Sequence, residues 1–254
     1  MHGDSLLGLA ATVAAMSAIV AARYLAVSGL FAWVAARLRP SVYAPADPLR
    51  RMRLRAQVRR EIGWSLLSAV IYGAPAGLVL WAWTAAGATR IYAGSSMPHW
   101  WIPVSVFVYL LVHDAWFYWT HRAMHHWPRL FRAMHAVHHE SRPPTAWAAM
   151  AFHPWEALSA AWLIPALTFV VPIHWGALVA VLLIATFFGV TNHMGVEIFP
   201  RRWIEGWFGR HVITAAHHSR HHSDYSANYG LYFRFWDRLC GTDRGLSEAP
   251  LTRG

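Results

Sequence analysis

Three clusters of histidines give this chain side chains that can bind metal at helical spacing. They are His121, His125 and His126, then His135, His138 and His139, then His218, His221 and His222. Residues three or four apart lie on one face of a helix, so a single helix can direct two imidazoles at one metal ion. Pro128 lies between the first two clusters, where it favours a helix end and lets the second cluster fold back beside the first.

The number of these imidazoles predicts more than one metal ion. Eight have the spacing to converge, namely His121, His125, His135, His138, His139, His218, His221 and His222. A structural zinc takes four ligands and a catalytic zinc typically three, so two ions with open positions fit the set better. Imidazole binds Fe, Zn, Cu and Ni, so the ligand type leaves the metal open. A metal-sequestering tract is disfavoured, because such tracts are low-complexity tails and these clusters lie within aromatic segments.

Two residues outside the clusters are further candidates. His193 follows an apolar stretch at a depth that matches the clusters, and is either a ninth ligand or a hydrogen-bonded residue at a helix end. Asp114 lies two helical turns before His121, and a carboxylate within the membrane is a functional candidate by default. It can accept the N–H of a ligating histidine and so fix the orientation of that ring, or it can pair with Arg23 or His113. Weaker candidates for such contacts are Tyr118, Glu156, Glu197 and Asp224.

The elements that must position these residues are membrane-spanning helices. Hydrophobic residues make up 56% of the 254 residues and charged residues only 13%, about half the usual share of a soluble domain. Five apolar stretches stand out: Leu6–Ala36, Ile62–Ala88, Trp100–Thr120, Trp155–Val171 and Ile173–Thr191. The last two form either two full spans or a re-entrant hairpin. We therefore predict an all-α, multi-pass transmembrane helical bundle of four to five spans, with a helical cap that carries the histidines; a soluble helical bundle is the alternative.

Arginine placement predicts the orientation of the chain. All basic residues except the histidines are arginines, and they gather in residues 37–60, 122–142 and 201–210, whereas the intervening connections hold only Arg90. The positive-inside rule then puts the N-terminus outside and all three clusters on the cytoplasmic side. We expect one integral-membrane domain over residues 1–254, with an N-terminal transmembrane region at 1–99, including its Arg-rich connection, and a histidine-box catalytic region at 100–243.

The pattern of the three histidine clusters and their flanking residues resembles the fatty acid hydroxylase/sterol desaturase superfamily of membrane di-iron oxygenases. The similarity rests on the three histidine boxes and on flanking segments over roughly Trp100–Asp243. These segments are His113–Arg122, Phe152–Glu156, Asn192–Gly195, Asn228–Gly230 and Phe235–Arg238. The resemblance implies that the eight box histidines bind two iron ions, and that the site uses O2 to oxidise an unactivated C–H bond.

The resemblance also implies partners. The substrate is a membrane lipid, such as a sterol-like molecule, a hopanoid, a carotenoid or a fatty acyl chain, and the product is an alcohol or an alkene. Aromatic residues that can line its passage, or simply pack in the core, are Trp116, Phe117, Trp147, Phe152 and Trp155. Because no haem- or flavin-binding motif is evident, we expect a small cytochrome b5-, ferredoxin- or rubredoxin-like electron donor, for which Arg-rich residues 50–60 offer a docking surface. No nucleic-acid partner is expected.

Three other classes remain alternatives. A membrane haem or quinone electron-transfer subunit typically places single histidines within facing spans, and a divalent-metal transporter needs ligands at mid-membrane on several spans. A membrane scaffold with a structural zinc cluster would bind metal without consuming O2.

Overall fold

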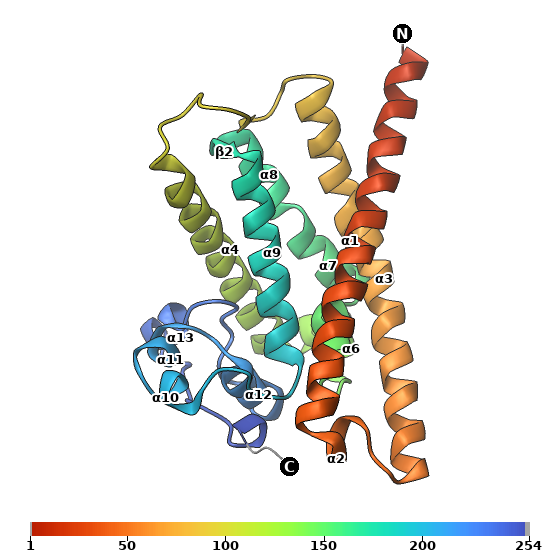
Figure 1. Cartoon of the computed structure of the whole chain (residues 1–254), viewed down its shortest axis with the longest axis vertical. Coiled ribbons are helices and arrows are strands. Elements are labelled where there is room, and N and C mark those ends of the chain that lie inside the picture. The colour runs from red at the N-terminus through yellow and green to blue at the C-terminus, as the bar shows by residue number, and fades with distance from the viewer. Residues whose placement is uncertain (1, 252–254) are drawn as a thin grey trace.

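The computed structural model describes residues 2–251, and four of its helices are long and apolar enough to cross a membrane. These are α1 (His2–Leu38), α3 (Pro48–Thr84), α4 (Trp101–His126) and α9 (Trp175–His193). They run roughly along the long axis of the molecule, with the N-terminus at one end and a cap of short helices at the other (Figure 1). The predicted helical membrane fold is confirmed, and the chain is an integral membrane protein.

The segment predicted as the fourth apolar stretch is not one long helix. It forms two short helices, α7 (Pro154–Ala161) and α8 (Leu163–Val170), which break at Trp162. Together they lead from the level of the cap to strand β2 (Ile173–His174), which pairs in parallel with β1 (Ile91–Tyr92) at the end away from the cap (Figure 1).

The Arg-rich connection is helical rather than extended. After α2 (Pro40–Tyr43), the carboxylate of Asp47 accepts the backbone N–H of Arg50 and caps α3, whose first residue is Pro48. Proline is favoured at the first helical position because its missing N–H has no partner there anyway. With 37 residues, α3 is roughly 55 Å long, so its basic end extends beyond a hydrocarbon core of about 30 Å.

Close backbone packing holds α1 against α3. A Cβ atom added to Gly73 would lie 2.5 Å from Cα of Ser17, and one added to Gly77 would lie 2.4 Å from Cα of Val13. Glycines four residues apart leave one face of a membrane helix flat enough for such contact. Two apolar clusters complete the core, one around Tyr109, between α4, α8 and α9, and one between α1 and α9.

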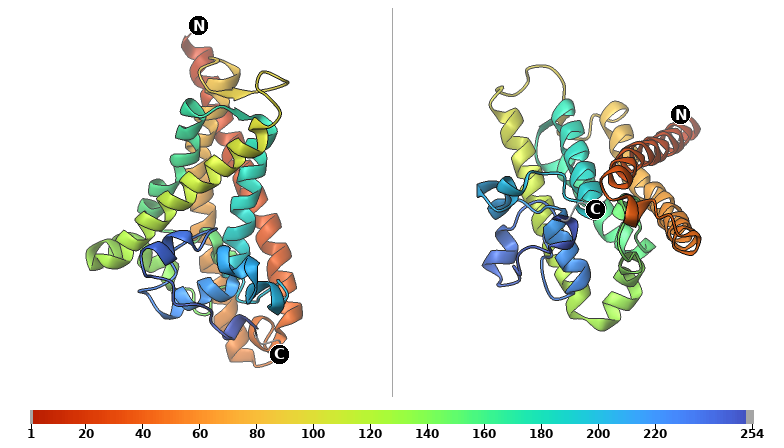
Figure 2. Two further views of the ribbon diagram at one scale, coloured as in Figure 1. Left: turned by 90° about the vertical axis from the view of Figure 1, so that its left-hand side faces the viewer. Right: turned by 60° about the horizontal axis from the view of Figure 1, so that its bottom comes forward.

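Short elements build the cap. On the chain segment between α4 and α7 these are α5 (Pro128–Leu130), the π-helical turn η1 (Phe131–His135), α6 (Ala136–His139) and the 3₁₀ turn η2 (Ala146–Met150). After α9 they are α10 (Arg201–Ile204), α11 (Trp207–His211), α12 (Ala215–Ser223), α13 (Phe235–Leu239) and η3 (Ala249–Leu251). Figure 2 shows this C-terminal part wrapped over the ends of α4 and α9.

Candidate metal centre

Nine buried or half-buried histidines gather where the cap meets the ends of α4 and α9. They form two groups, and within each group the nitrogen atoms on offer all lie within 4.8 Å of one another. The first group comprises His121, His125, His135, His139 and His221, and the second comprises His138, His193, His218 and His222. Each sequence cluster contributes to the first group, and the second and third clusters also contribute to the second group.

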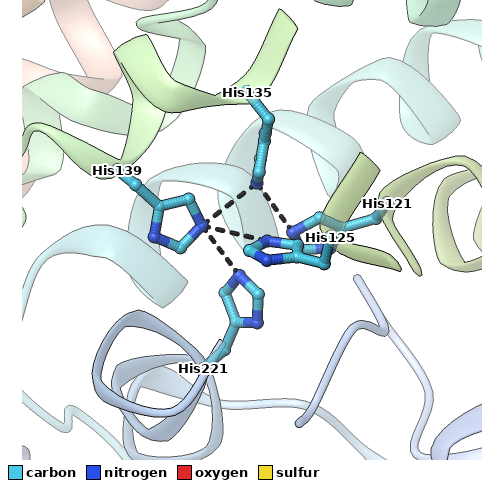
Figure 3. A group of neighbouring side chains, drawn as sticks. All are labelled: His121, His125, His135, His139 and His221. Carbon is cyan, nitrogen blue, oxygen red and sulfur yellow. Dashed lines mark hydrogen bonds between the residues drawn. The ribbon is translucent and has the colours of Figure 1, made fainter. Parts of the chain in front are cut away.

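The first group converges through its Nε2 atoms (Figure 3). The Nε2 atom of His139 lies 3.1 Å from those of His125, His135 and His221. His121 completes the group, with its Nε2 atom 3.0 Å from that of His135. Here α4 supplies two rings, the η1–α6 segment two and α12 one. This places five lone-pair donors around one point.

The second group has the same arrangement around a separate point. The Nε2 atom of His193 lies 2.9 Å from those of both His138 and His218. His222 joins through its Nε2 atom, 3.2 Å from that of His218. His193 ends α9, so this helix adds a ring that none of the three clusters contains. The structure therefore places His193 among the possible ligands rather than at an isolated helix end.

Several outward-facing Nδ1 atoms have acceptors of their own. His121 pairs with the carbonyl oxygen of Tyr229 at 2.9 Å, and His221 with that of Ala227 at 2.8 Å. His135 pairs with a carboxylate oxygen of Glu156 at 2.7 Å. An N–H at Nδ1 leaves the Nε2 lone pair free to face inward, which is the tautomer a metal ligand needs.

Burial favours the neutral form of these rings. Desolvation, reinforced by the neighbouring histidines, lowers the pKa of His135, His138 and His139 well below the ordinary histidine range. The same causes lower the pKa of His218, His221 and His222. Neutral imidazoles with convergent lone pairs are the donor set of a metal site. Two groups of five and four such donors fit two metal ions.

Asp114 has a different partner from the one expected. Its Oδ1 atom accepts the backbone N–H groups of Leu231, Tyr232 and Phe233, at 3.2, 2.7 and 3.3 Å. It makes no hydrogen bond to any histidine among the described residues. Asp114 thus holds the segment that includes Tyr229, whose carbonyl accepts from His121. Among the residues that the structure describes, the carboxylate hydrogen-bonded to a member of the metal groups is that of Glu156.

The other predicted residues have structural partners. Tyr118 contacts the hydroxyl of Thr242 at 2.9 Å, and Glu197 accepts the N–H of Ala216 at 3.2 Å at the start of α12. Asp224 accepts from Ser226. Of the five aromatic residues, Phe117 and Phe152 approach the metal groups, since their ring centroids lie 5.1 Å from His121 and 5.3 Å from His138. Trp116 and Trp147 pack against other aromatic rings, and Trp155 is exposed.

Two buried carboxylates that shape the site carried no clear signal in the sequence. Asp237 accepts the N–H groups of Tyr229 and Gly230, each at 2.9 Å, so it fixes the loop that receives His121. Glu61 on α3 accepts hydrogen bonds from Thr145 and Gln57, and so ties α3 to the loop after the second cluster. The only hint was position: Asp237 lies in a family-like segment, and Glu61 directly precedes an apolar stretch.

Four long apolar helices with two histidine groups at one end define an integral membrane protein whose buried imidazoles could hold metal ions. Residues 106–242, more than half of the chain, match the fatty acid hydroxylase family, and the chain belongs to that family. The family expected from the histidine boxes is thereby confirmed.

The chain is similar to several sterol-modifying enzymes. Lathosterol oxidase of Rattus norvegicus is 31% identical over 192 residues, which are 74% of this chain and 62% of the relative. A delta(7)-sterol 5(6)-desaturase of Gibberella zeae is 29% identical over 144 residues, 57% of this chain and 43% of the relative. A methylsterol monooxygenase of Aspergillus fumigatus is 32% identical over 152 residues, 57% and 48% of the two chains. The chain thus spans about two fifths to three fifths of these relatives' lengths, and no solved structure matches it.

Proposed function

We propose that this protein is an O2-dependent di-iron oxidoreductase that hydroxylates or desaturates a membrane lipid. The observation that carries the proposal is the pair of buried histidine groups, with five and four convergent imidazoles. Bound there, two iron ions would supply the capacity to reduce O2 and oxidise a C–H bond. Family membership supports iron over the other metals that imidazole binds.

The reaction balances with an external two-electron supply. In hydroxylation, one C–H bond, O2, two electrons and two protons give a C–OH group and one water. In desaturation, two adjacent C–H bonds, O2, two electrons and two protons give a C=C bond and two waters. Because the cap carries the metal groups, the donor is expected to be a small soluble carrier protein or a carrier domain that reaches this end.

The protein's own contribution is to position the lipid and exclude water. Phe117 and Phe152 give each metal group one apolar neighbour on a face that a lipid body can contact. The rings of Phe131 and Tyr229 lie 5.3 and 5.5 Å from that of His125, the half-buried member of the first group. Holding one C–H bond near the oxidant is what selects among similar bonds. The names of the relatives favour a sterol-like substrate over the other lipid classes.

The histidine end is proposed to face the cytoplasm. The basic end of α3 and the cap lie at the same end of the molecule, opposite the N-terminus (Figure 1). The positive-inside rule assigns such an end to the cytoplasmic side. Fusion of a reporter to each terminus checks this orientation.

The proposal is tested by lipid profiling. Cells that express the chain under 18O2 are compared with cells that express His138→Ala or His221→Ala, one histidine from each group. We expect a lipid that gains one 18O atom or loses two hydrogens only with the unsubstituted chain. Iron-loaded protein that consumes no O2 in the presence of reductant and lipid extract would contradict the proposal.

A further inference from the structure

The first histidine group reaches the surface at one open pocket of the cap. The pocket is lined by Arg122, His125, His126, Tyr225, Ser226, Tyr229 and Thr242. His125 is half-buried, whereas the other four histidines of its group are buried. A molecule in this pocket would therefore contact a side chain of the metal groups without entering the membrane.

Tyr225 extends this contact to a second histidine. Its half-buried ring lies with its centroid 4.5 Å from that of His139 and 5.7 Å from that of His125. His139 is the ring whose Nε2 atom lies within 3.1 Å of three others in the group. One wall of the pocket is thus in direct ring contact with the centre of the first group.

The surroundings of the pocket are basic. Arg122 and His126 are part of its lining, which contains no carboxylate among the described residues. The guanidinium of Arg142 lies 5.4 Å from the centroid of the Tyr225 ring. Next to Tyr225, Asp224 faces Arg220 at 4.0 Å as well as the charge of Arg244. Beside Thr242, Asp237 is buried, and Asp243 is paired with Arg234 and Arg238. Positive charge therefore dominates this rim.

A second pocket provides a comparison. It is lined by Pro48, Arg51, Met52, Arg55, Ala56 and Arg59 on the basic end of α3, where the sequence suggested that a donor docks. No histidine of either metal group lines it. Positive charge is present at both pockets, but contact with the metal groups is present at only one of them.

We propose that the pocket at His125 and Tyr225 is the docking surface for an acidic one-electron carrier protein. This inference rests on the proposed function, because the reaction with O2 consumes two electrons that the chain does not supply. Charge complementarity at the rim favours an acidic partner and speeds its encounter. Two carrier molecules, each oxidised by one electron, deliver the pair, and Tyr225 provides the aromatic contact between the docked carrier and His139. This proposal places the docking site on the cap and not at residues 50–60, where the sequence suggested it.

Binding to the metal-free protein tests the docking surface. The probe is oxidised plant-type ferredoxin, an acidic [2Fe–2S] protein, titrated against the chain in phosphatidylcholine nanodiscs at 0.15 M salt. We expect the double variant His126→Glu with Arg244→Glu to weaken binding by roughly tenfold, because each substitution puts a carboxylate at the rim that repels an acidic partner. The matched control is Arg51→Glu with Arg55→Glu, which reverses charge at the second pocket. At this salt the Debye length is about 8 Å, so the control should leave affinity within about twofold.

Electron transfer tests the role of Tyr225. With iron-loaded protein in its ferric form as the electron acceptor, reoxidation of pre-reduced ferredoxin is followed by stopped flow under anaerobic conditions. Tyr225→Leu should slow the limiting rate at saturating ferredoxin while leaving its affinity unchanged, and Tyr225→Phe should retain the rate. If Tyr225→Leu lowered the affinity for ferredoxin but left the limiting rate unchanged, Tyr225 would not be the contact between the docked carrier and His139.

Three outcomes overturn the docking proposal. One is ferredoxin binding that the α3 control abolishes and the cap variant leaves intact, and another is the absence of any salt-dependent binding. The third is retention of phosphatidylglycerol by the unsubstituted chain but not by the cap variant, with ferredoxin affinity unchanged, which would make the pocket a lipid headgroup site. Since the binding assay uses metal-free protein, its result is independent of whether the loaded protein oxidises a lipid.

Discussion

The Nδ1 atom of His135 lies 2.7 Å from Oε1 of Glu156, and both side chains are buried. The two residues come from different elements, since His135 ends η1 and Glu156 lies in the first turn of α7. An N–H held on Nδ1 by this carboxylate leaves Nε2 of His135 free to face His121 and His139. Glu156 therefore orients one member of the first histidine group.

Glu156→Gln should weaken metal binding. The amide keeps the size of the side chain, but its single carbonyl oxygen is a weaker acceptor than the carboxylate, and the ring of His135 is held less firmly. Loss of such a supporting contact typically costs 10- to 100-fold in metal affinity. Metal content after dialysis against graded chelator measures the change. Glu205→Gln serves as control, because the carboxylate of Glu205 is exposed and pairs with Arg201. Equal metal retention in both variants would remove Glu156 from the metal centre.

His193→Ala should remove metal from one group only. The second group has four histidines, and His193 is the ring whose Nε2 atom contacts two of the others. The substitution leaves this group three donors and removes the ring that links His138 to His218, whereas the first group keeps all five of its donors. We expect purified protein to fall from about two metal ions per chain to about one, with loss of lipid oxidation. His211→Ala, on an exposed histidine near Trp207, should change neither. Two ions retained in His193→Ala would show that His193 is not a ligand.

Spacing in the sequence predicted which histidines meet, because residues three and four apart on a helix share a face. The spacing could not predict how the histidines divide between the two metal groups. His138 and His139 are adjacent, so their rings leave the backbone in different directions, and the structure assigns them to different groups. That division depends on the π-helical turn η1 and on the approach of α12, neither of which the spacing of the histidines shows.

The hydrogen-bond partners of the buried carboxylates could not be predicted from the spacing of residues either. Asp114 shares a helical face with His121, and this made it the favoured partner of a ligand. The structure instead brings Leu231, Tyr232 and Phe233 to it from more than a hundred residues away. Nothing in the local sequence shows that α7 folds against η1, so the sequence does not single out Glu156. Long-range hydrogen bonds of this kind leave no periodic trace in a single sequence.

Asp114→Ala should destabilise the cap more than Asp114→Asn. Alanine leaves the N–H groups of Leu231, Tyr232 and Phe233 without their acceptor, and each of the two buried ones costs about 1–3 kcal/mol. Asparagine keeps one oxygen for them, so it should fold but hold the Tyr229 carbonyl less firmly against His121. We expect turnover to fall more than metal content in Asp114→Asn. Thermal unfolding in detergent, metal content and O2 consumption separate these effects. Unchanged turnover in Asp114→Asn would limit Asp114 to a folding role.

Gly77→Ala should push α1 away from α3, because the new Cβ atom would meet the backbone of Val13 at 2.4 Å and backbone cannot rotate aside. Overpacking of this kind typically costs 1–3 kcal/mol. Gly63 lies on the same helix with nothing within 4 Å of an added Cβ, so Gly63→Ala gains only the helical preference of alanine, about 0.5–1 kcal/mol. The two substitutions make the same chemical change in one helix, and their apparent melting temperatures should move in opposite directions. A lower melting temperature for both would mean that alanine is tolerated poorly throughout α3, and the close contact of α1 with α3 would then not explain the glycine at position 77.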